Sequence, residues 1–99
     1  MDSLLTSIRA VFTGVKWDGR DGKYHAALPG GYIQVTEEVR MDGRTSGQVA
    51  FYVNNPHKRQ IFSFGWRNRE QRDEQIVRAY SEIQAIHNAV RAALGVDNG

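Results

Sequence analysis

The hydrophobic pattern of this chain changes its period near residue 70, and that change limits the folds open to it. Across residues 14–66 apolar and polar residues largely alternate, as in strands, and glycine-containing turns interrupt them. From residue 70 the apolar residues recur every three to four positions, as on one face of a helix: Ile76, Ala79, Tyr80, Ile83, Ile86, Val90 and Leu94. The pattern predicts one small sheet covered by one long helix.

The predicted fold is therefore α+β, with residues 1–99 forming a single domain. We expect a short helix over 3–12, a meander of four to five antiparallel strands over 14–66, and the long helix over 69–94. The strands are expected at about 15–17, 23–28, 32–41, 49–53 and 60–66. They should pair antiparallel, because the links between them are too short for parallel crossovers. Asn68 is the expected cap of the long helix, and residues 95–99 should fray.

The composition indicates a soluble protein of the cytoplasm. A hydrophobic fraction of 40% is typical of a globular domain. The chain has no cysteine, which excludes disulfides and thiolate metal sites and fits a reducing compartment. The longest apolar runs are far shorter than a membrane span, and the N-terminus lacks the layout of a signal peptide.

The sequence contains no recognisable catalytic centre. His25, His57 and His87 lack the spacing of metal ligands, and no serine stands in a nucleophile-elbow motif. His87 lies within the apolar stripe, either as a buried general base or as a histidine at the edge of the core bonded to a backbone carbonyl. The carboxylates near the turns are expected to be solvated: Asp18, Asp21, Glu37, Glu38 and Asp42. We therefore expect a protein that is not an enzyme and holds neither cofactor nor metal.

Charge is distributed unevenly along the chain. Residues 1–69 carry ten Lys and Arg against six Asp and Glu, whereas residues 70–99 carry three against five. A basic sheet backed by an acidic helix is either a surface for a polyanion or an ordinary solvated surface. Tyr32 and Tyr52 are expected on the outer side of the sheet near Arg40. Aromatic rings among cations bind single-stranded nucleic acids by stacking, and they are equally common at protein interfaces.

Residues 14–28 resemble the first hairpin of the AP2/integrase-type DNA-binding domain. The matching positions are Gly14, Val15, Trp17, Lys23, Tyr24, Ala26 and Leu28. The resemblance covers about fifteen of the 99 residues. It implies a sheet that reads the major groove with its strands and is backed by a helix. It also implies that Lys16, Arg20, Lys23 and His25 face DNA.

Two classes of function remain open. The first is a nucleic-acid-binding accessory protein that uses basic turns and the outer side of the sheet. The second is a small protein-binding adaptor or inhibitor, of the kind common in phage genomes, that docks on a partner through its sheet edge or its tyrosine-bearing face. The partner of the second class could itself be a nucleic-acid-processing complex. The candidate binding residues are Lys16, Arg20, Lys23, His25, Tyr32, Arg40, Arg44, Tyr52, Lys58 and Arg59.

Overall fold

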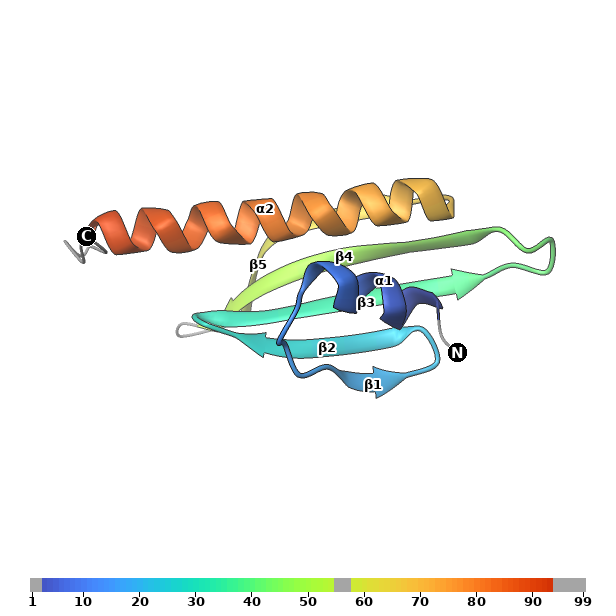
Figure 1. Ribbon diagram of the computed structural model, residues 1–99, viewed down its shortest axis with the longest axis horizontal. Coiled ribbons are helices and arrows are strands. Elements are labelled where there is room, and N and C mark those ends of the chain that lie inside the picture. The colour runs from blue at the N-terminus through green and yellow to red at the C-terminus, as the bar shows by residue number, and fades with distance from the viewer. Residues whose placement is uncertain (1–2, 55–57, 94–99) are drawn as a thin grey trace.

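The structure is a computed structural model that describes residues 3–54 and 58–93. Along this part of the chain a short helix comes first, five strands follow, and a long helix comes last (Figure 1). The elements are α1 (Ser3–Val11), β1 (Asp18–Arg20), β2 (Lys23–Leu28), β3 (Gly31–Val39), β4 (Thr45–Asn54), β5 (Lys58–Trp66) and α2 (Arg69–Ala93). The strands form one antiparallel sheet in the order β1-β2-β3-β4-β5. The predicted α+β fold, with a meander between a short and a long helix, is confirmed.

Tight turns set the register at the start of the sheet. Asp21 and Gly22 join β1 to β2 with φ angles of 55° and 78°, the two positive values that a type I′ hairpin turn requires. The strand predicted at 15–17 is wrong, because those residues only connect α1 to β1. The segment between α1 and β2 contains two Asp-Gly pairs, at 18–19 and 21–22, and the second one makes the turn. Residues 18–20 are therefore strand and not loop.

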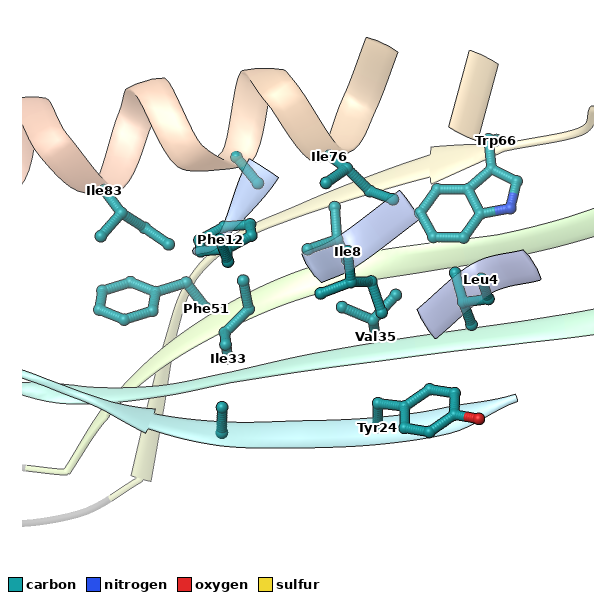
Figure 2. Packing of buried hydrophobic residues seen from close by; sticks show 13 residues of the cluster. Leu4, Ile8, Phe12, Tyr24, Ile33, Val35, Phe51, Trp66, Ile76 and Ile83 are labelled. Atoms are coloured by element: carbon teal, nitrogen blue, oxygen red, sulfur yellow. The ribbon is translucent and has the colours of Figure 1, made fainter. Parts of the chain in front are cut away.

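Both helices pack on the same face of the sheet, which we call the inner face. Figure 2 shows Leu4 and Ile8 of α1, Phe12 directly after it, and Ile76 and Ile83 of α2 pointing toward the strands. The strands contribute Tyr24, Ala26, Ile33, Val35, Val49, Phe51 and Trp66 to the same core. Phe62 and Phe64 pack against it, so the predicted contact between the aromatic residues of β5 and the core under α2 is confirmed.

Helix α2 begins with a side-chain cap. The backbone N–H of Gln71 donates to Oδ1 of Asn68 at 2.8 Å, and the backbone N–H of Arg67 donates to Oε1 of Gln71 at 2.9 Å. These two bonds satisfy backbone donors at the entrance of the helix. The expected cap at Asn68 is confirmed, whereas the expected frayed tail at 95–99 lies outside the described residues.

A buried ion pair joins α1, β3 and α2. Nη1 of Arg72 lies 3.2 Å from Oε2 of Glu37, and their side chains are only 4% and 7% exposed. The same guanidinium donates to Oγ of Ser3 at 3.2 Å and to Oγ of Ser7 at 2.8 Å. The expectation of a solvated Glu37 is wrong, since β3 directs this carboxylate toward the helices, where Arg72 neutralises it.

The hairpin between β3 and β4 extends beyond the helices (Figure 1). The alternation in β3 predicts Val39 and Met41 on the same apolar face as Ile33, and residue 41 within the strand. In the structure β3 ends at Val39, and the side chains of Val39 and Met41 are exposed. Both residues lie where the hairpin runs beyond the helices that cover the rest of the inner face, although Thr45, the cross-strand partner of Val39, is buried.

Candidate functional site

The sheet face opposite the helices, which we call the outer face, carries the candidate site. Cross-strand pairing aligns its side chains in three rows, and neighbouring rows lie about 7 Å apart along the strands. The first row holds Lys23, Thr36, Gln48 and Gly65, the second His25, Gln34, Ala50 and Ser63, and the third Ala27, Tyr32, Tyr52 and Gln60. No described element covers this face, which is polar at most of its positions.

Cations gather at the end of the outer face nearest the β3–β4 hairpin. Lys23, Arg40 and Arg67 line an open depression, and we call these three residues the cationic end. The depression is also lined by Thr36, Glu38, Ser46 and Gln48, whose hydroxyl and amide groups can donate hydrogen bonds, apart from the carboxylate of Glu38. The arrangement suits a phosphate group, which accepts hydrogen bonds and carries negative charge.

Acidic side chains reduce the net charge of this region to a modest value. Arg20 of β1 lies opposite Lys23 of β2, so its side chain is on the same side of the sheet and adds a fourth cation to the outer face. Asp18 and Glu38 lie on the same face, so four cations stand against two carboxylates and leave +2. The exposed Arg20 also lies 4.0 Å from Asp21, an ion pair that solvent screens strongly.

Two tyrosines form an aromatic pair at the opposite end of the outer face. Tyr32 and Tyr52 are direct cross-strand partners, their ring centroids are 5.0 Å apart, and the rings are nearly parallel at 14°. Both side chains are half-buried, so part of each ring reaches solvent. Their row lies two rows from Lys23, a separation of about 14 Å along the strands.

The structure separates the remaining predicted residues from this face. Lys16 lies in the segment before β1, and Arg44 lies in the β3–β4 loop, 3.7 Å from Asp42. Arg59 pairs with Val53, which packs against the core, so the register places it with the inner face. Lys58 begins β5, and its side chain lies outside the described residues. The outer face therefore carries Arg20, Lys23, His25, Tyr32, Arg40 and Tyr52. The prediction that the two tyrosines lie near Arg40 is wrong, because they are at opposite ends of this face.

The sequence analysis missed Arg67 and the polar residues between the two ends. Arg67 follows Trp66, and because Phe62, Phe64 and Trp66 point inward, the alternation could have placed residue 67 outward. The alternation of β3 places Gln34 on the same side as Tyr32. Gln48 and Ser63 carry no charge and form no motif, so nothing in the sequence marks them. Oγ of Ser63 donates to Oε1 of Gln48 at 3.4 Å, which links the first two rows.

Two of the three histidines, His25 and His87, lie in the described part of the chain. His87 is half-buried, and its Nε2 lies 3.0 Å from the carbonyl oxygen of Pro29, which confirms the interpretation of a carbonyl-bonded histidine. His25 is exposed in the middle row, and His57 lies outside the described residues. Within residues 3–54 and 58–93 no three His, Asp or Glu side chains come together as metal ligands.

Neither helix in the described part of the chain has an apolar stretch of the length that crossing a bilayer requires. Comparisons with protein-family models, with curated proteins and with solved structures find no match to this chain.

Proposed function

We propose that this protein is a nucleic-acid-binding accessory protein of the cytoplasm that holds its ligand on the outer face. One observation carries the proposal: a sheet face without a covering element has three cations around a depression at one end and an aromatic pair at the other. Phosphates would lie at the cationic end, where ion pairs release counterions. The lack of cysteine supports the cytoplasmic assignment.

The test is a titration of labelled DNA and RNA, single-stranded and duplex, followed by fluorescence anisotropy at ~50 mM salt. A variant with Lys23, Arg40 and Arg67 replaced by Ala should bind more weakly than the wild type. Three phosphate contacts predict a log–log salt slope of about −2 on single strands and about −3 on duplex, and the variant should bring the slope close to zero.

A matched control removes the same charge elsewhere. Arg9, Lys16 and Arg59 are exposed residues of α1, of the segment before β1, and of β5, and none belongs to the cationic end. Replacing these three by Ala should leave binding and salt slope within about twofold of wild type, because only non-specific attraction changes. Equal losses in both variants, or no binding at protein concentrations above about 10⁻⁴ M, would contradict the proposal.

A second function is a protein-binding adaptor or inhibitor, and one observation favours it. β5 is a nine-residue strand at the edge of the sheet, and it exposes Ile61 at 43%. An edge strand of this length can pair with an extended segment of a partner. The two functions differ in their response to nucleic acid, so the titration above separates them.

A further inference from the structure

We infer that the outer face binds a single strand of DNA, laid along the strands from the cationic end to the tyrosine pair. This inference rests on the proposed function and names its ligand class. A single strand offers phosphates and unpaired bases, and the face offers a partner for each at its two ends. Each contact in this arrangement is made with a phosphate or with a base. No contact involves the 2′-hydroxyl, the group that distinguishes RNA from DNA.

The width of the sheet argues against a duplex read through the major groove. Five strands at a spacing of about 4.8 Å span roughly 19 Å, whereas the major groove of B-DNA is about 12 Å wide. A two-stranded ribbon or a helix enters that groove, and the sheet is two-stranded only in the β3–β4 hairpin beyond Thr36 and Gly47. Lys23 and Arg67 lie outside that ribbon, on β2 and directly after β5. A duplex could therefore touch this face only through its backbone.

The distribution of charge also favours a single strand. The cations lie at one end of the face, and the second row consists of Asp18, His25, Gln34, Ala50 and Ser63. A duplex backbone would need cations spaced along its path, which these rows do not supply. Side-chain amides and hydroxyls instead form hydrogen bonds with the exposed edges of unpaired bases. Gln34, Gln48 and Ser63 provide such groups between the two ends.

The tyrosine pair supplies the stacking surface. Stacking on an aromatic side chain tolerates any base, because every base has a flat π-face. Tyr32 and Tyr52 lie about 14 Å from the row of Lys23, so a strand with a phosphate at the cationic end can place a later base against their rings. The predicted site covers only a few nucleotides.

The first experiment changes the ligand and leaves the protein intact. The wild type is titrated with an eight-residue oligo-dT, with an abasic backbone of equal length, with oligo-U, and with the matching duplex. We expect oligo-dT to bind about tenfold more tightly than both the abasic strand and the duplex, and at least as tightly as oligo-U. Equal binding of oligo-dT and the abasic strand would overturn the stacking role, and tighter binding of duplex or of oligo-U would overturn the assigned ligand.

The second experiment changes the rings. Tyr32→Leu with Tyr52→Leu keeps apolar bulk and should weaken oligo-dT binding about tenfold while changing duplex binding less than twofold. Tyr32→Phe with Tyr52→Phe keeps the rings and should bind oligo-dT like wild type. Unchanged oligo-dT binding in the Leu variant, with duplex bound at least as well, would refute the single-strand inference and leave the proposed function standing. Absence of binding to every ligand would refute both.

Discussion

At the scale of single residues, burial depends on partners far away in the sequence. The alternation of β3 sets Glu37 on the same side as Val35, yet a lone carboxylate there should be solvated. It is buried because Arg72, 35 positions later, supplies the opposite charge. The hydrophobic period of β3 contains no information on a partner in a distant helix. For the same reason the sequence could place Lys23 and Arg40 in the basic part but could not show that Arg67 joins them.

Gly47 illustrates a residue whose role depends on its neighbours. A Cβ at this position would collide with the carbonyl oxygen of Thr36 and come within 2.8 Å of Cζ2 of Trp66. We predict that Gly47→Ala lowers the free energy of unfolding by about 1–3 kcal/mol, because backbone and indole must shift. Chemical denaturation measures the change.

Gly65 is the matched control, since a Cβ there would meet only the carbonyl oxygen of Gly47, at 3.5 Å. Gly65→Ala should leave stability unchanged or raise it slightly by restricting the unfolded chain. Equal midpoints for the two variants would show that Trp66 and β3 do not crowd Gly47.

At the scale of elements, the sequence predicts those helices and strands that a hydrophobic period and a capping residue define. The stripe of α2 and its cap at Asn68 follow from local pattern. Ile76, Ala79 and Ile83 of the stripe are buried as predicted, whereas Tyr80 is 38% exposed, and the side chains of Val90 and Leu94 lie outside the described residues. The first strand was misplaced because a three-residue strand has no period and two Asp-Gly pairs compete for the turn. The end of β3 was misplaced because the sequence does not show where the neighbouring strand and the helices stop covering it.

The contacts between elements centre on Arg72, which gives a prediction. Arg72→Met should cost about 3–5 kcal/mol, because Glu37 would remain buried without its partner and two serine hydroxyls would lose a donor. Adding Glu37→Leu to Arg72→Met should recover most of that loss. Urea denaturation of the two single variants and the double variant measures the coupling.

Arg69 serves as the control for this cycle, because it lies exposed in the first turn of the same helix. Arg69→Met should change stability by less than about 0.5 kcal/mol. Additive effects of the Glu37 and Arg72 substitutions would mean that the pair does not stabilise the junction of α1, β3 and α2.

At the scale of the whole molecule, short links predicted the meander and the structure confirms it. Consecutive strands are neighbours throughout the sheet, which is the arrangement that short connections favour. Function is less accessible from sequence, because the outer face is assembled from single residues of five strands. The tyrosines, Lys23, Arg40 and His25 of that face are visible in the pattern, whereas Arg67, Gln48 and Ser63 are not.

Stability should also be independent of metal ions. The chain has no cysteine, and its described residues bring no group of metal ligands together. We therefore predict that prolonged treatment with EDTA leaves the melting temperature unchanged within about a degree relative to a sample kept in buffer. A clear drop that zinc restores would show that a structural ion had been removed.

The bonds from Ser3 and Ser7 to Arg72 have a consequence for synthesis on the ribosome. Helix α1 emerges first, but the guanidinium that it contacts is made 69 residues after Ser3. At 5–20 residues per second this interval lasts roughly 3–14 s. The hairpins of the sheet can close as they emerge, and they give Leu4, Ile8 and Phe12 a surface to pack on. Arg72 follows only with α2, so until then the carboxylate of Glu37 has no opposite charge beside it and the junction of α1, β3 and α2 closes last.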